Sequence, residues 1–398
     1  MPDIAHAVPM SLPQGLTPKR SLLIATIGFL TLVDLFATQA ILPSLAEAYG
    51  VKPSEIGLAA NASTFGMAIS GLLVGVFSGA VERKRAISLS LLFLAIPTAM
   101  LAFAPNLAVF AGLRVVQGLF MAGAFTLTLT HLAERCEVRT AQALAAYVTG
   151  VVASNLIGRL TAAFVASLVG AEQSFLFFAV LNLAGAALVA TALHRNAPMP
   201  MQGQGRFWTA WSKHLADSEL RRTFAIGFLI LFGFIGIFTY VGFVLMRAPH
   251  ALSMTALGLV FLVFAPSMVT TPLAGNAVRK HGPGRSAVAG LALAIVGLLL
   301  MIIPSLASVV VGMTLVGIGT FFAQAVATGH VGRIAHGDKA AASGLYLSSY
   351  YCGGLAGAAL VGQLFDRSGW PAAIAGVFAA LGLAALLALK LKQPEGAR

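Results

Sequence analysis

The chain has 398 residues, of which 58% are hydrophobic and only 10% are charged, and its 25 Lys and Arg outnumber its 13 Asp and Glu to give a formal net charge of +12. A composition this apolar excludes an ordinary soluble globular domain. It indicates a protein that crosses a membrane several times.

The first 20 residues are polar, contain proline and lead into an apolar stretch too long for the core of a signal peptide, so we expect a retained cytoplasmic tail. Apolar stretches of about 20 residues, the length that spans a bilayer core, then recur along the chain. They predict an all-α membrane protein with twelve transmembrane helices. The expected spans are residues 21–46, 56–77, 87–104, 107–131, 141–168, 174–194, 223–245, 253–275, 286–304, 307–332, 340–365 and 371–391.

The longest connection divides these spans six and six. Its second part carries Phe207, Trp208, Trp211 and Leu215 near one helical face and charges on the other, which is typical of a helix at the membrane surface. The predicted organisation is a tail (1–20), a six-helix bundle (21–194), a cytoplasmic linker with an interfacial helix (195–222), a second six-helix bundle (223–391) and a C-terminal tail (392–398).

The Lys and Arg residues between the spans lie mostly on one side of the predicted membrane. The loops on the opposite side hold only Lys52, Arg247 and Arg367. The positive-inside rule therefore predicts a multi-pass protein of the bacterial inner membrane with both termini in the cytoplasm. The excess of positive charge then faces anionic lipid head groups and does not indicate nucleic-acid binding.

An internal repeat underlies the two bundles. A shift of 199 residues places His131 on His330, Gly118 on Gly317, Ala124 on Ala323, Ala141 on Ala340, Tyr147 on Tyr346 and Gly158 on Gly357. Parallel halves of this kind, related by an axis along the membrane normal, are typical of transporters with a site between the halves near the midplane. The repeat predicts two pseudo-symmetric six-helix bundles.

Four short motifs resemble those of a known family. They are RVVQG at 114–118 in the fourth span, GVFSGAVERKR at 75–85 in the loop after the second span, SNLIGRL at 154–160 in the fifth span and FTYVGF at 238–243 in the seventh. With them the whole chain resembles a twelve-helix member of the major facilitator superfamily, and within it the bacterial drug and sugar efflux branch. The resemblance implies proton-coupled transport of a small organic compound by a monomer, with no cofactor and no metal.

The loop motif departs from the family pattern. Where the family pattern has Asp, this chain has Gly79. In the second-half copy of the motif, GNAVRKHGPGR at 275–285, the corresponding residue is Arg279. Glu82 or Glu134 could partly replace the missing carboxylate. The cytoplasmic gating residues that the resemblance implies are Gly75, Glu82, Arg83, Lys84 and Arg279.

Asp34 is the one acid of the sequence that lies deep within a predicted span. At about 1.5 Å of rise per residue it lies about 20 Å from the inner end of its helix, and Arg114 lies about 10 Å from the outer surface. In a core about 30 Å thick these are the same level. The same arithmetic puts Arg159 about 15 Å deep. The sequence therefore predicts three charged side chains in one layer of the first half.

A charge at this depth costs about 2.5–3.5 kcal/mol and normally faces a cavity or a partner. An Asp34–Arg114 pair could serve as a structural register alone. Burial disfavours the carboxylate and a nearby guanidinium favours it, so movement of Arg114 could instead make Asp34 take or release a proton. Arg159 could dock an acidic or hydroxyl-rich substrate, or could be satisfied by Asn155 and helix carbonyls.

Further polar and aromatic side chains are expected to line the same interior. Amides could bind substrate or cross-link helices, and aromatic rings could form the wall of a pocket or simply pack. These candidates are Gln39, Gln117, Asn155, Phe238, Tyr240, Tyr350 and Tyr351. His131 and His330, at equivalent inner helix ends, are interpreted as interface residues.

An enzyme is not indicated, because the sequence has no Walker loop, no His/Glu pattern of an intramembrane zinc protease and no nucleophile elbow. The first hypothesis is a proton-coupled exporter of a small organic compound (a drug, sugar or metabolite), with Asp34 and Arg114 as the coupling pair. The alternatives are a proton-coupled symporter or exchanger of a small organic anion, and a membrane sensor or scaffold that transports nothing.

Overall fold

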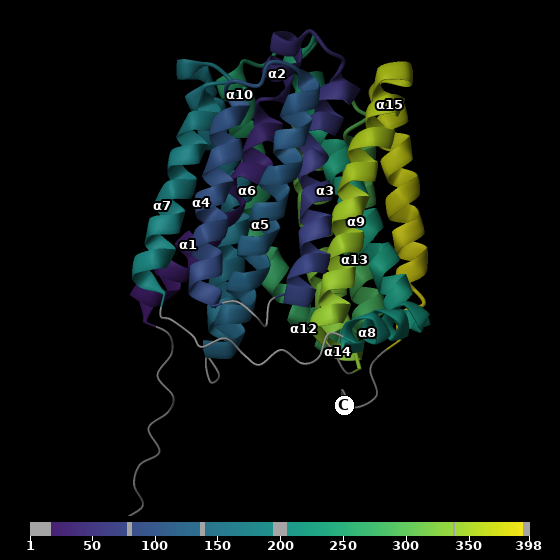
Figure 1. Ribbon diagram of the computed structural model, residues 1–398. Coiled ribbons are helices and arrows are strands. Elements are labelled where there is room, and N and C mark those ends of the chain that lie inside the picture. The colour runs from purple at the N-terminus through teal and green to yellow at the C-terminus, as the bar shows by residue number, and fades with distance from the viewer. Residues whose placement is uncertain (1–16, 78–81, 136–139, 194–204, 337–338, 393–398) are drawn as a thin grey trace, which may run out of the picture.

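The computed structural model describes residues 17–77, 82–135, 140–193, 205–336 and 339–392, and the regular secondary structure within these ranges is all helical (Figure 1). The first half contains α1 (Pro18–Ala40), α2 (Leu42–Tyr49), α3 (Pro53–Phe77), α4 (Arg83–Leu101), α5 (Leu107–Arg135), α6 (Thr140–Val169) and α7 (Ser174–Ala192). The second half contains α8 (Gly205–Ala216), α9 (Ser218–Met246), α10 (Met254–Val260), η2 (Phe261–Phe264), α11 (Ala265–Thr270), η3 (Thr271–Leu273), α12 (Ala274–His281), α13 (Pro283–Leu300), α14 (Leu306–Ile334) and α15 (Lys339–Ala388).

Eleven helical stretches among the described residues are long and apolar enough to cross a membrane. The last of them, α15, contains 50 residues and is broken at Gly369, where φ is 75°. Glycine adopts this left-handed conformation without the steric penalty of a side chain, and Pro371 restarts the helix because a first turn needs no N–H there. The two arms of α15 therefore give twelve crossings, as the sequence predicts.

The eighth span is not the single helix that we expected at residues 253–275. It runs from Met254 to His281 and is interrupted by the 3₁₀ segments η2 and η3. Pro266 lies in the first turn of α11 and Pro272 lies within η3. Proline lacks the N–H that a continuous α-helix requires and clashes with the preceding turn, so the regular hydrogen-bond ladder ends locally. The tighter 3₁₀ turn of η2 places side chains three residues apart on one face.

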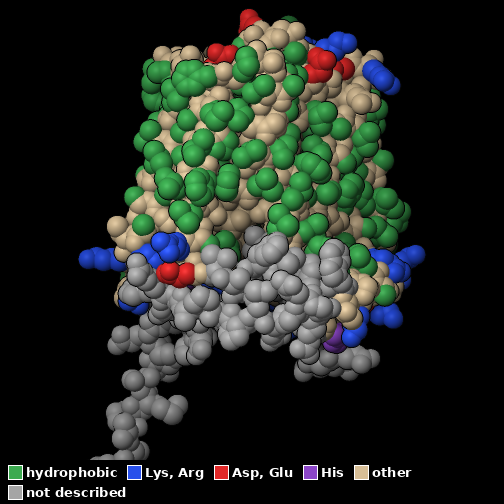
Figure 2. All heavy atoms as spheres, in the orientation of Figure 1, with side chains coloured by type: hydrophobic (Ala, Val, Ile, Leu, Met, Phe, Trp, Pro, Cys, Tyr) green, Lys and Arg blue, Asp and Glu red, His purple; other side chains and the backbone are tan. Residues whose placement is uncertain are grey.

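A wide belt of hydrophobic side chains covers the face shown in Figure 2, and the coloured Lys, Arg, Asp and Glu side chains lie at its two ends. Large apolar residues on the outer surface, such as Phe103 and Leu168, are 74% and 68% exposed. Lipid tails rather than water are the natural solvent for such a surface. The structure is therefore that of a multi-pass membrane protein.

The two halves repeat the same glycine contacts. Gly28 of α1 packs on the ring of Tyr147 in α6, and Gly227 of α9 packs on the ring of Tyr346 in α15. These residues are related by the 199-residue shift, and small residues at both positions let the helices approach closely. The same shift maps the contact between Gly158 and Val33 onto the contact between Gly357 and Phe232. The structure thus confirms the predicted repeat.

The halves meet along α3 and the first arm of α15, and along α6 and α10. Ser348 donates a 2.8 Å hydrogen bond to the carbonyl of Ala68 across this seam. At the end opposite the chain termini, the backbone N–H of Ser54 donates to Oδ2 of Asp366 at 3.3 Å, and the Ser54 hydroxyl donates to the same oxygen. Asp366 therefore caps the first turn of a helix that belongs to the other half.

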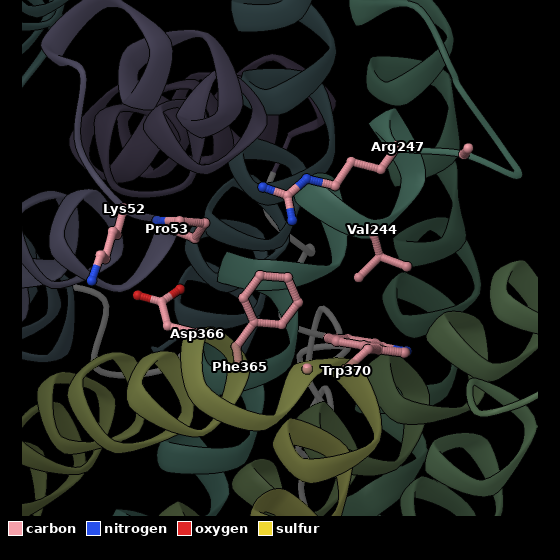
Figure 3. A pocket seen from close by; sticks show the side chains of 9 residues that line it. Lys52, Pro53, Val244, Arg247, Phe365, Asp366 and Trp370 are labelled. Atoms are coloured by element: carbon pink, nitrogen blue, oxygen red, sulfur yellow. The ribbon is translucent and has the colours of Figure 1, made fainter.

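Figure 3 shows the surroundings of this cap. Lys52 and Arg247, two of the few basic residues that the sequence places on this side, line a pocket together with Asp366. The carboxylate of Asp366 points towards Pro53 at the start of α3. A polar contact between the halves therefore lies at this end of the molecule, beside the pocket.

Candidate functional site

Asp34 lies in the last third of α1, is 3% exposed and is surrounded by neutral donors. Asn182 of α7 donates to its Oδ2 atom at 2.7 Å, and Gln117 of α5 donates to the same atom at 3.3 Å. The hydroxyl of Thr98 lies 3.2 Å from Oδ2 and 2.8 Å from the carbonyl of Leu94, so its single hydrogen serves one of the two. The other carboxylate oxygen, Oδ1, has no hydrogen-bond partner.

Asp34 and Arg114 do not form the direct pair that their equal depth in the sequence allows, and the structure links them differently. Nη1 of Arg114 lies 3.4 Å from the backbone carbonyl of Asp34, and among the described residues no ion pair within 4.0 Å joins the two side chains. Gln117 connects them, because its Oε1 atom accepts from Arg114 at 2.5 Å while its amide donates to Asp34. A neutral amide thus separates the two charges.

Arg114 is held firmly in place. Its Nε atom donates to the carbonyl of Ala60 at 2.7 Å, and Nη2 donates to the hydroxyl of Ser63 at 3.1 Å. Its third nitrogen donates to Gln117. Each nitrogen of this buried guanidinium therefore has an acceptor, which is the condition for burying an arginine at low cost.

Arg159 of α6 is fully buried and is satisfied much less well. Its Nη2 atom donates to Oε1 of Gln39, and its Nε and Nη1 atoms have no hydrogen-bond partner. Among the residues that the structure describes, no carboxylate lies within 4.0 Å of it. Gln39 itself donates to Asn61 at 3.3 Å, which in turn donates to Thr239 of the second half at 3.1 Å.

Five phenylalanine rings surround the guanidinium of Arg159. Their centroids lie 4.5 to 5.9 Å from Cζ, with the shortest distances, 4.5 and 4.6 Å, to the two rings of η2. Such distances are those of cation–π contacts. The rings are Phe36 of α1, Phe234 and Phe238 of α9, and Phe261 and Phe264 of η2. We call this set the phenylalanine cage.

The phenylalanine cage depends on local helix geometry. Phe234 and Phe238 are four residues apart in α9, so they share one face of an α-helix and their centroids lie 4.7 Å apart. Phe261 and Phe264 are three residues apart in the 3₁₀ turn η2, where that spacing places them on one face, and their ring planes differ by 4°. Four of the five rings thus come from the half that does not contain Arg159.

Asn155 lies one turn before Arg159 in α6 and is fully buried. Neither its amide nitrogen nor its amide oxygen has a hydrogen-bond partner. The alternative in which Asn155 satisfies the guanidinium is therefore wrong for this structure. Buried polar atoms without partners carry a cost, and together with Arg159 they mark a place where the protein leaves polar groups available.

The second half lacks this polar layer. Under the 199-residue shift, Asp34 corresponds to Gly233 and Asn182 corresponds to Leu381, and these two residues pack against each other without polar atoms. The remaining equivalents are Gly297 for Thr98, Met313 for Arg114, Val316 for Gln117, Gly354 for Asn155 and Ala358 for Arg159. Since the apolar half forms the same fold, the layer is not required to build a six-helix bundle.

The three tyrosines predicted as pocket walls are not among the rings around Arg159. Tyr240 is fully buried where α9 meets α15, and its hydroxyl donates to the carbonyl of Ala358 at 2.5 Å. Tyr350 and Tyr351 are buried in α15, with their ring centroids 5.5 Å apart. Among the predicted aromatic residues, Phe238 is the one that contacts Arg159.

The predicted gating residues lie at the end near the termini. Glu82 precedes α4, Arg83 and Lys84 begin it, and Gly75 lies in the last part of α3. Residues 78–81 of the loop motif, including Gly79, are outside the described residues. Arg279 lies near the end of α12 and donates to Asn276 within the same helix.

Sequence reasoning missed Asn182, the donor closest to Asp34. A signal was present, because Asn182 is an amide in the middle of an otherwise apolar span, where polar side chains normally have a partner. Thr98 gave a weaker signal, since threonine is common in transmembrane helices. In the described ranges, no three His, Cys, Asp or Glu side chains gather as metal ligands.

Two pseudo-symmetric bundles, one of which holds a polar layer in the membrane interior, are typical of a multi-pass membrane transporter. The chain belongs to the Major Facilitator Superfamily, whose family model matches residues 24–265 and 243–398. It is a secondary transporter of that superfamily, a family of transporters rather than enzymes. The efflux branch stays a prediction.

Relatives support this assignment. The uncharacterized MFS-type transporter YybF of Bacillus subtilis is 26% identical over 375 residues, which cover 92% of this chain and 93% of that protein. The gentisate transporter of Corynebacterium glutamicum is 27% identical over 311 residues, 73% of this chain and 68% of that one. A bacterial homolog of the human lysosomal transporter Spinster, inward-facing and unoccupied, shares the fold with a TM-score of 0.75 and 16% identity, covering 94% of this chain and 97% of the other.

Proposed function

We propose that this chain is a proton-coupled secondary transporter that exports a small organic compound by alternating access, with Asp34 as the proton site and Arg159 as the substrate contact. The observation that carries the proposal is the polar layer itself, which is present in one half and replaced by apolar residues in the other. A costly feature that the fold does not need is best explained by function.

The surroundings of Asp34 suit a group that gains and loses a proton. Its Oδ2 atom accepts hydrogen bonds from neutral amides, which support the charged form without fixing it as an ion pair. Its Oδ1 atom has no partner and can carry the proton. Because Gln117 links the carboxylate to Arg114, a shift of α5 against α1 changes the charge felt by Asp34.

Arg159 suits a substrate contact at the seam between the halves. It belongs to the first half, whereas four rings of its phenylalanine cage belong to the second. Movement of the halves therefore changes the surroundings of the guanidinium, and a bound compound that touches both sides senses that movement.

The Lys and Arg distribution and the bacterial relatives support a location in the inner membrane with both termini in the cytoplasm. The family resemblance supports a monomer, and the likeness of the motifs to those of the efflux branch supports export rather than import. Import or exchange of a small organic anion is the second candidate, and it is favoured by the absence of a carboxylate near Arg159 among the described residues.

The test is proton flux in liposomes that contain the purified protein and an internal pH dye. A pH gradient is imposed, and lipophilic cations, sugars and organic acids are added one at a time. We expect one class of compound to cause proton movement in the wild type and none in Asp34→Asn. Glu47→Gln, an acid-to-amide change at an exposed position of α2, is the matched control and should behave as the wild type.

Equal proton flux in the wild type and Asp34→Asn would refute the assigned role of Asp34. Compound exchange without proton movement in both proteins would favour the anion exchanger. No transport of any compound in a protein that remains folded and monodisperse would favour the third alternative, a sensor or scaffold.

A further inference from the structure

Resting on the proposed function, we infer the substrate class: the site at Arg159 takes a monoanionic aromatic carboxylate. The observation behind this inference is a buried cation with two unpartnered nitrogens inside the phenylalanine cage. The inference concerns what binds and leaves the direction of transport open.

The charge of the ligand follows from a comparison of the two buried arginines. Arg114 donates from all three nitrogens to acceptors of the protein. Arg159 donates from one nitrogen to the neutral Gln39, and no described carboxylate lies within 4.0 Å. A guanidinium with free N–H groups in a water-poor site binds a carboxylate through charge-assisted hydrogen bonds. A cationic ligand is repelled by the same charge.

A single negative charge suits the site better than two. Arg159 is the guanidinium with free N–H groups, whereas every nitrogen of Arg114 donates to an acceptor of the protein. A second charge on the ligand would lie against phenylalanine rings, which cannot solvate an anion. A sugar brings acceptors but no charge, so it leaves the guanidinium uncompensated.

The aromatic part of the ligand follows from the rings. Phe234 lies at the centre of a cluster, with its centroid 6.2 Å from Phe36, 4.7 Å from Phe238 and 5.7 Å from Phe264. Edge-to-face and offset contacts at these distances are the geometry that aromatic rings prefer. We expect an aryl group to join this cluster in the same geometry when movement of the halves separates α9 and η2 from Arg159, with its carboxylate on the guanidinium.

The unpartnered amide of Asn155 adds a polar group close to this site. It lies one turn from Arg159 in α6, and both of its polar atoms are free. Such an amide can donate to the carboxylate or accept from a ring hydroxyl. It therefore allows a hydroxylated aromatic acid as well as an unsubstituted one.

The experiment measures binding to the purified protein in detergent micelles by titration calorimetry. The probes are benzoate, cyclohexanecarboxylate and benzamide, of which the second removes the aromatic ring and the third removes the charge. We expect benzoate to bind at least about tenfold more tightly than either of the others, a difference of about 1.4 kcal/mol. Equal affinity for benzoate and cyclohexanecarboxylate, or for benzoate and benzamide, overturns the inference, as does no binding of any probe.

Two variants locate the effect. Arg159→Gln should remove the preference for benzoate over benzamide, and Phe264→Leu should reduce the preference for benzoate over cyclohexanecarboxylate. Phe243→Leu is the matched control, because Phe243 is a buried residue of α9 that packs on Phe365 away from the guanidinium. If Arg159→Gln does not fold, the wild-type probe series and the milder Phe264→Leu variant still decide the question.

This assay needs neither a pH gradient nor Asp34, so the two proposals can fail separately. Benzoate binding that persists in Asp34→Asn, combined with proton-independent transport, would refute only the proton coupling. Asp34-dependent proton flux with another compound, combined with no selectivity for benzoate, would refute only the substrate class.

Discussion

The cap that Asp366 provides for α3 gives a quantitative prediction about the transport cycle. The carboxylate accepts from the backbone N–H and the hydroxyl of Ser54, so this contact joins the halves at the end opposite the termini. Loss of a helix cap costs about 0.5–2 kcal/mol. Each difference of about 1.4 kcal/mol changes an equilibrium constant tenfold. Asp366→Ala should therefore raise the population of molecules whose halves are separated at this end by a factor of about 2 to 30.

The assay is electron spin resonance between two nitroxide labels. Glu47 of α2 and Arg367 of α15 are exposed, lie in different halves and can each be replaced by a labelled cysteine after the two native cysteines are removed. In Asp366→Ala, the fraction of long distances between the labels should increase. Asp366→Asn keeps an acceptor that caps helices as well as aspartate does, so its effect should be small.

A distance distribution that is unchanged in Asp366→Ala would refute the reasoning, because the cap would then contribute nothing to the closed state. Ser54→Ala removes the hydroxyl contact and leaves the N–H, so its effect should be intermediate. The double variant Ser54→Ala/Asp366→Ala should shift the distribution no further than Asp366→Ala alone, since both substitutions break one contact.

Two further predictions concern stability, measured by reversible unfolding in mixed micelles. Gln117→Leu removes a hydrogen-bond partner from both Asp34 and Arg114, and at about 1–3 kcal/mol for each buried group it should destabilise the protein by about 2–6 kcal/mol; a loss below about 1 kcal/mol would contradict the bridging role. Gly28→Ala places a methyl group 2.4 Å from a backbone carbonyl of α6 and should destabilise the protein. Gly382→Ala meets nothing within 4 Å and should stabilise the protein by about 0.5–1 kcal/mol. If the two substitutions change the free energy of unfolding equally, α1 and α6 move apart at no cost and the reasoning is wrong.

The sequence by itself determined the number of spans and the division into halves. Both follow from rules that act along the chain, namely the length needed to cross a bilayer and the recurrence of small residues after 199 positions. It also determined the depth of the polar residues, because helical rise converts position in the chain into depth. Asp34, Arg114 and Arg159 were therefore expected to share one layer of the first half.

The tertiary structure alone decided which side chains meet within that layer. Depth does not determine the direction in which a side chain points, so the link through Gln117 and the bond from Asn182 were not predictable from spacing. The phenylalanine cage depends on two further features of the tertiary structure. The 3₁₀ turn η2 aligns Phe261 with Phe264, and α9 and η2 of the second half pack against Arg159 of the first. Rotation about each helix axis is set by contacts between helices that are distant in sequence, and this is the information that a pattern along one chain does not contain.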